Sequence, residues 1–190
     1  MMFSHISTSV DGFINDRDGD DSFFPIDESF MAHIDSILAG IGGMVFGRKA
    51  FDQLATFWPK AAELGDAGLA RQAEPMNRLP KYVLTHRPLE TTWAASQAVT
   101  VDELHSIKAK ATAPIAVFAG AGAISSVLQA GLLDQVRLLR QPVILGDGVP
   151  LFARGASHRS LKLLKAGALA TGAILETYEI DNVTQPDARI

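Results

Sequence analysis

The sequence predicts an α/β fold of three layers, α/β/α, whose central sheet is mixed, mostly parallel, and antiparallel at its C-terminal edge. Apolar segments of strand length alternate with helical segments over the first two thirds of the chain, which is typical of parallel βαβ units. After a glycine turn at Gly120 only strands follow, which indicates an antiparallel edge. The 190 residues, 47% of them hydrophobic, suffice for one domain with a substantial core. We expect that domain over residues 1–181 and a polar tail over 182–190.

Apolar periodicity and turn residues locate each element in order. The predicted strands are Met2–Thr8, Gly43–Gly47, Lys81–Thr85, a short strand from Ile115, Asp134–Arg140, Leu161–Ala168 and Ala173–Ile180. The predicted helices are Asp27–Leu38, Lys49–Ala55, Val101–Lys110 and one that follows Gly120. A Gly- and Asp-rich loop covers 9–26, and 57–79 is expected to be irregular, with a loose helix between Asp66 and Met76. Asp147-Gly148 marks a turn.

Composition excludes several classes of protein. A net charge of −4 argues against a general nucleic-acid binder, and the absence of cysteine excludes disulfides and thiolate chemistry. The N-terminus lacks the pattern of a signal peptide, and the longest nearly apolar run, 37–47, is too short to span a bilayer. We therefore expect a cytoplasmic protein that binds neither nucleic acid nor a membrane. The five histidines show no metal-binding spacing, so we expect no metal site.

The glycine turn is the first candidate binding site. Here Gly120, Ala121, Gly122, Ala123 and Ile124 lie between an apolar strand and a helix. Glycines at such a junction let backbone N–H groups approach a phosphate, and the helix dipole favours the anion. A tight turn without a ligand explains the pattern equally well.

Two further turns have the same character. Gly47, Arg48 and Lys49 follow a strand and place two cations at a helix N-terminus, where they oppose the helix dipole unless an anion binds. Thr85, His86 and Arg87 follow the next strand and suit a phosphate such as the 2′-phosphate of NADP. Solvated basic residues and a polar turn before Pro88 are the alternatives. Three phosphate-suited turns at strand ends favour one shared nucleotide site.

The order of these motifs resembles the dihydrofolate reductase superfamily, above all the reductase domain of bacterial riboflavin-biosynthesis enzymes and its stand-alone relatives. The resemblance covers 2–180. The segments that carry it are Ser9-Val-Asp-Gly-Phe-Ile14, Val45-Phe-Gly-Arg-Lys49, Tyr82-Val-Leu-Thr-His-Arg87, 117–128, Gly131-Leu-Leu-Asp134 and Pro142-Val-Ile-Leu-Gly-Asp-Gly-Val-Pro-Leu-Phe152. Ala119 and Ala121 depart from it, because glycines are common at both positions.

The resemblance implies NADPH as cofactor. Residues 47–49 would then lie at the pyrophosphate and adenosine phosphates, 85–87 at the adenine side and the 2′-phosphate, and 120–124 at the pyrophosphate and nicotinamide ribose. Asp11 would border the nicotinamide, and Asp27 would occupy the place of the carboxylate on the substrate-side helix. Asp147 would help to hold the loop after the first strand. A homodimer is common among the relatives.

The sequence therefore predicts an NADPH-dependent reductase that transfers a hydride to a C=N or C=O of a small, heterocyclic substrate, with Asp27 or a water beside it as proton donor. The alternative role for Asp27 is a helix N-cap, and a helix N-terminus lowers a carboxyl pKa when a donor needs it raised. A Rossmann dehydrogenase is disfavoured because the third glycine of its fingerprint is missing. A non-catalytic NADP(H)- or nucleotide-binding protein is the other alternative.

Overall fold

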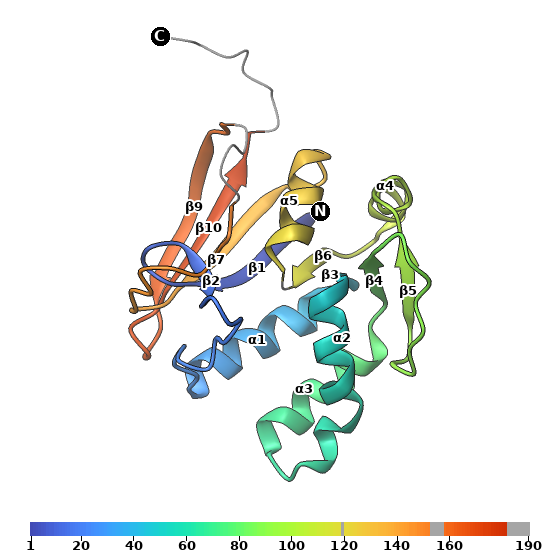
Figure 1. Ribbon diagram of the computed structural model, residues 1–190, viewed down its shortest axis with the longest axis horizontal. Coiled ribbons are helices and arrows are strands. Elements are labelled where there is room, and N and C mark those ends of the chain that lie inside the picture. Colours follow the sequence, from blue (N-terminus) through green and yellow to red (C-terminus); the bar gives the residue numbers. More distant parts are fainter. Residues whose placement is uncertain (119, 153–157, 182–190) are drawn as a thin grey trace.

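The computed structural model describes residues 1–118, 120–152 and 158–181 (Figure 1). Eight strands form one sheet in the order β5-β4-β3-β6-β1-β7-β10-β9. Their bounds are β1 Met2–Thr8, β3 Gly43–Gly47, β4 Lys81–Leu84, β5 Ser96–Val99, β6 Ile115–Phe118, β7 Gln135–Arg140, β9 Leu161–Ala168 and β10 Ile174–Ile180. The short strands β2 (Phe13–Asn15) and β8 (Val149–Pro150) form a separate pair.

The sheet has the predicted mixed topology. The six strands from β5 to β7 are parallel, β10 is antiparallel to β7, and β9 is antiparallel to β10. The helices that cover the sheet are α1 Glu28–Gly40, α2 Arg48–Phe57, α3 Ala67–Arg78, α4 Val101–Lys110 and α5 Ala121–Gln129. Figure 1 shows α4 and α5 on one side of the sheet and α1 to α3 on the other, so the three-layer α/β/α prediction is confirmed.

Side chains that alternate along the strands supply two hydrophobic cores, one on each face. Val45 and Val117 belong to the core that includes Ile124 of α5. Phe46 belongs to the opposite core, together with Leu38 of α1 and Phe51 of α2. Burying one side chain of this size stabilises the fold by roughly 1.5–3 kcal/mol, so both helical layers are held by apolar contact.

The segment 57–79 is more regular than predicted. A 3₁₀ helix (η1, Trp58–Glu63) precedes α3, which continues two residues beyond the loose helix that the sequence indicated. Pro75 inside α3 argues against a helix locally. Contacts with α1 offset that cost, since Gln72 donates hydrogen bonds to the Met31 carbonyl (3.3 Å) and the Asp35 carboxylate (2.9 Å).

Three strands lie outside the predicted set. β5 is a four-residue edge strand of mixed polarity, and β2 and β8 are shorter still. Segments this short carry too few residues for a period to emerge, and their pairing depends on partners far along the chain. The predicted tail at 182–190 and Ala119 lie outside the described residues. Within the described part of the chain no helix combines the length and apolarity needed to cross a membrane.

Candidate functional site

The three predicted phosphate turns meet at one edge of the sheet. They follow β4, β3 and β6, which are neighbours and run parallel, so their carboxyl ends lie side by side. A Cβ atom built on Gly47 would lie 3.4 Å from the Cβ of Ala123, and one built on Gly120 would lie 4.0 Å from that of Ala50. The first turns of α2 and α5 are therefore in contact through small residues.

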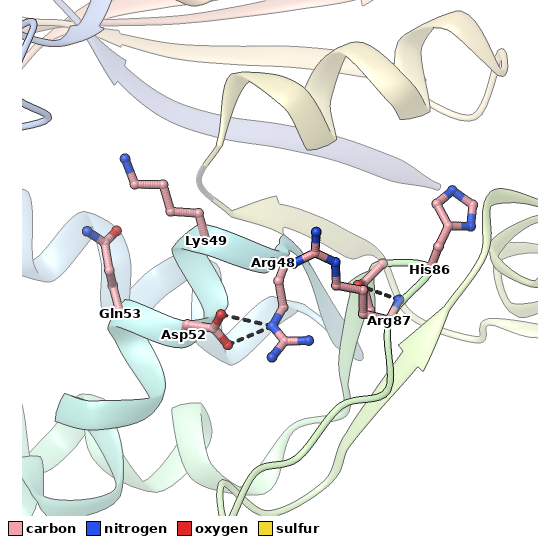
Figure 2. A pocket seen from close by; sticks show the side chains of 7 residues that line it. Arg48, Lys49, Asp52, Gln53, His86 and Arg87 are labelled. Atoms are coloured by element: carbon pink, nitrogen blue, oxygen red, sulfur yellow. Dashed lines mark hydrogen bonds and ion pairs between the residues drawn. The ribbon is translucent and has the colours of Figure 1, made fainter.

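A hollow of about 570 Å³ opens between α2 and the segment after β4. It is lined by the predicted residues Arg48, Lys49, Thr85, His86 and Arg87, together with Asp52 and Gln53. Figure 2 shows the Arg87 side chain reaching back toward α2, whereas the His86 ring points away from Arg48. The backbone N–H of Arg87 donates to the Thr85 hydroxyl at 3.1 Å, which fixes the turn.

Charge in this hollow is predominantly positive. Asp52, one helical turn beyond Arg48, accepts from its Nε at 2.8 and 2.9 Å. Arg48 also donates from Nη1 to the Pro88 carbonyl at 3.0 Å and so ties α2 to the segment after β4. Lys49 and Arg87 form no ion pair within the described residues. Three cations and one carboxylate thus face the hollow, which favours an anion.

The helix N-termini differ in a way that singles out this edge. Helices α1, α3 and α4 begin at Asp27, Asp66 and Thr100, whose side chains accept from the backbone of the first turn. Helices α2 and α5 begin at Gly47 and Gly120, and among the described residues no side chain caps either one. Their first N–H groups are left for another acceptor, and both sets lie at the carboxyl edge of the sheet.

Within the glycine turn the residues have different roles. Gly120 has φ +95°, a conformation that L side chains rarely adopt, and it begins α5. Ala121 and Gly122 are in the accessible first turn, whereas Ala123 and Ile124 are buried in the core. The Ile124 N–H already donates to the Gly120 carbonyl at 3.2 Å. The backbone N–H groups of 121–123, in the first turn of α5, are therefore available to a ligand.

Asp27 caps α1. Its Oδ1 accepts from the Ser29 hydroxyl at 2.6 Å and from the Phe30 N–H at 2.9 Å. These hydrogen bonds, first that from Ser29, lower the pKa of the Asp27 carboxyl. Ser29 in turn accepts from the Ala170 N–H at 3.3 Å, which joins the start of α1 to the β9–β10 turn.

Asp11 ties the loop after β1 to the segment after β7. Its carboxylate accepts from the Leu145 N–H at 3.2 Å and from the Gly146 N–H at 2.7 Å. A hydrogen bond from Ser9 and these two backbone donors lower the pKa of Asp11 to about 2. Its catalytic role stays a prediction, and its contacts are those of an anchor. Asp147 works alongside it by pairing with Arg17 of the same loop, as the resemblance implied.

Two residues of the hollow were missed by sequence reasoning, Asp52 and Gln53. The spacing of Arg48 and Asp52, four apart at the start of a helix, is itself a signal for an ion pair and would have found the first of them. Gln53 carries no signal that distinguishes it from any exposed helical glutamine.

The model of the RibD C-terminal domain matches residues 2–175. The chain belongs to the RibD C-terminal domain family. This membership confirms the resemblance inferred from the motif order.

Relatives of this RibD C-terminal domain extend over nearly its whole length. It is 26% identical over 184 residues to the uncharacterized protein YyaP of Bacillus subtilis (strain 168), with 91% of each chain covered. A putative riboflavin biosynthesis protein from Shewanella sp. PV-4 superposes with a TM-score of 0.71 at 24% identity, covering 95% of this chain and 98% of that one. Dihydrofolate reductase from Enterococcus faecalis, complexed with NADP(H) and RAB-propyl, gives 0.64 at 14% identity, covering 95% and 96%. These structures establish a dihydrofolate reductase-like fold.

Proposed function

We propose that this protein is an NADPH-dependent reductase that acts on a C=N or C=O bond of a small pyrimidine- or pteridine-like substrate. One observation carries the proposal. The two helices without a side-chain cap, α2 and α5, both begin at the edge where Arg48, Lys49 and Arg87 gather. Membership of the RibD C-terminal domain family and the NADP(H) in the E. faecalis structure support the choice of cofactor.

The residues present fit such a cofactor. Arg87 and Thr85 would hold the 2′-phosphate, because a guanidinium and a hydroxyl suit a dianionic phosphate. The free N–H groups of α2 and α5 would hold the pyrophosphate. Gly47 lies close to the first turn of α5, since a Cβ built on it would already be in van der Waals contact with Ala123 at 3.4 Å. NADPH would supply the hydride, and the chain would position it and exclude water.

A proton must also reach the substrate. The lowered pKa of Asp27 keeps its carboxyl ionised at neutral pH, so we propose that it orients a water molecule which delivers the proton. Asp27→Asn keeps a good N-cap and removes the charge. Turnover that is unchanged in this variant, measured on an identified substrate, contradicts the role.

The second candidate is an NADP(H)-binding protein without catalysis. The capping contacts and lowered pKa of Asp27 favour it, because they leave that carboxyl poorly suited to donate a proton. NADPH binding without oxidation of NADPH in the presence of pyrimidine, pteridine and carbonyl compounds would select this alternative.

The Arg87→Gln variant tests the cofactor assignment. Loss of a charge-assisted hydrogen bond costs about 1.5–3 kcal/mol, so its affinity for NADPH should fall at least about tenfold while that for NADH stays within twofold. Calorimetric titration with both nucleotides measures this. Arg78→Gln is the matched control, because Arg78 pairs with Glu74 on the exposed surface of α3. Equal losses for NADPH and NADH, or no NADPH binding by the unaltered protein, contradict the assignment.

A further inference from the structure

A row of polar side chains crosses the sheet on the face that α1 covers. His5 of β1 is in register with Phe118 of β6 on one side and with Arg137 of β7 on the other. The row continues through Thr177 of β10 to Lys165 of β9. His33 of α1 lies against it, with its ring centroid 5.0 Å from that of His5.

Among the described residues, no carboxylate forms an ion pair with the positive charges in this row. Arg137 donates to the Gln135 side chain at 2.9 and 3.2 Å, and its guanidinium carbon lies 3.6 Å from the centre of the Phe3 ring. In the described ranges no ion pair involves Arg137 or Lys165. Burial lowers the pKa of Arg137, because the cation has lost part of its hydration. A partly desolvated cation without an anion is costly unless a ligand supplies one.

Two buried nitrogen atoms beside this cation also lack partners. His5 Nδ1 and His33 Nε2 are shielded from solvent, and neither has a hydrogen-bond partner among the described residues. His5 itself is only 5% exposed. An unsatisfied buried polar atom costs about 1–3 kcal/mol, so two of them beside an unpaired arginine indicate a site that is completed by a ligand.

The position of the row links it to the candidate active site. Phe118 is the last residue of β6, two positions before Gly120, and His5 is its register partner. The His5 end of the row therefore lies beside the carboxyl end of β6, on the α1 side, next to the turn proposed to hold the pyrophosphate and nicotinamide ribose. With NADPH placed as proposed above, the His5 end of the row would be the end nearer the nicotinamide. The Arg137 guanidinium lies over Phe3 and Gln135, two residues nearer the amino ends of β1 and β7.

We infer that Arg137, assisted by His5 and His33, binds an oxyanion, a carboxylate or phosphate group carried by a small molecule. Arg137 already donates from Nε and Nη2 to Gln135, and among the described residues its remaining N–H groups, on Nη1 and Nη2, are free to pair with such a group. A neutral imidazole N–H from each histidine complements them. As a substrate subsite this inference rests on the reductase proposed above, and it makes that substrate an anionic one. As an anion site it stands on its own.

Nuclear magnetic resonance of the histidine side chains tests the inference on the full chain at pH 7. Inorganic phosphate and acetate are titrated separately, with His5 and His33 assigned from single His→Asn variants. We expect saturable chemical-shift changes of both rings, with a dissociation constant in the millimolar range. The anion that binds more tightly, phosphate or acetate, identifies the group that the site prefers. Arg137→Gln should weaken binding at least tenfold. Arg140→Gln is the matched control, because Arg140 is on the opposite face of β7, paired with Glu176 at 2.8 Å.

The absence of any saturable shift of His5 and His33 at 50 mM of either anion overturns the inference, as does unchanged affinity in Arg137→Gln. If Arg137→Gln does not fold, Arg137→Lys, which keeps the charge and loses the fork, takes its place with the same criteria. The NMR signal of His86 distinguishes failure of the anion site from failure of the proposed NADPH-dependent function. It lies at the nucleotide hollow, so NADPH should shift His86 whether or not the row binds an anion.

Discussion

A single buried imidazole gives this fold a measurable sensitivity to acid. Burial, together with the neighbouring charges of His33 and Arg137, lowers the pKa of His5 to about 3. The unfolded chain binds the proton near pH 6.5, so below that pH the unfolded state holds more protons than the folded state. Above about pH 6.5, His5 therefore does not reduce the free energy of unfolding. As the pH falls from there toward 3, the free energy of unfolding decreases.

The His5→Phe variant tests this linkage. Between pH 6.5 and 4.5 the free energy of unfolding of the unaltered protein should fall by about 2 kcal/mol through His5, and the variant should lose correspondingly less. Urea denaturation at both pH values measures the difference. His105→Gln, a change at an exposed residue of α4, should keep the original slope. The window lies above the pH at which Asp11 titrates, because the pKa of that carboxyl is lowered to about 2.

At this scale the sequence located the residues that line the hollow better than the residues of the polar row. Gly47, Arg48 and Arg87 were singled out because each lies at the end of a strand or within three residues after it, where a local motif suffices. His5, His33 and Arg137 were missed because what joins them is register between strands and the seating of α1. No single stretch of sequence carries that information.

The loop after β1 is the element whose attachment is most sharply defined. Its strand β2 pairs with β8, and Gly148, at φ +154°, approaches the backbone of Asn15 so closely that any Cβ would collide with the carbonyl oxygen. The Arg17–Asp147 pair and the Asp11 hydrogen bonds reinforce this attachment. Together they hold the loop at the edge of the sheet where the candidate site lies.

Substituting Gly148 by Ala should detach this loop. The collision of the new Cβ with Asn15 adds to the roughly 1–2 kcal/mol that a side chain costs at a backbone position with positive φ. We expect tryptic cleavage after Arg17, an exposed residue, to accelerate at least about tenfold. Gly172→Ala is the control, because Gly172 also has a positive φ (+83°) and its added Cβ would meet only ordinary contacts. Equal cleavage rates in the two variants would show that Gly148 does not anchor the loop.

Elements of five or more residues with clear periodicity were predicted to within a few residues. The N-cap at Asp27 was placed correctly because a proline and a helical apolar pattern frame it. The length and regularity of α3 were underestimated, because this helix is stabilised by hydrogen bonds from Gln72 to α1. Strand β5 depends on pairing with β4 at the sheet edge. Neither of these contacts can be predicted from local sequence propensity.

The whole molecule assembles the candidate site through its topology. Because β4, β3 and β6 are adjacent and parallel, turns separated by more than 70 residues of sequence share one edge. The fold class, the parallel part of the sheet and the antiparallel C-terminal edge all followed from the order of elements. The strand order does not follow from that order, since β6 lies between β3 and β1. The position of all three turns at strand ends nevertheless favoured one shared site.

A crystal structure of the protein with NADPH bound tests this account most directly. We predict density for one extended dinucleotide whose 2′-phosphate lies within hydrogen-bond distance of Arg87 and whose pyrophosphate accepts from the first turns of α2 and α5. Density for NADPH at another place on the molecule, or none in crystals grown at a cofactor concentration that saturates the protein in solution, would contradict it.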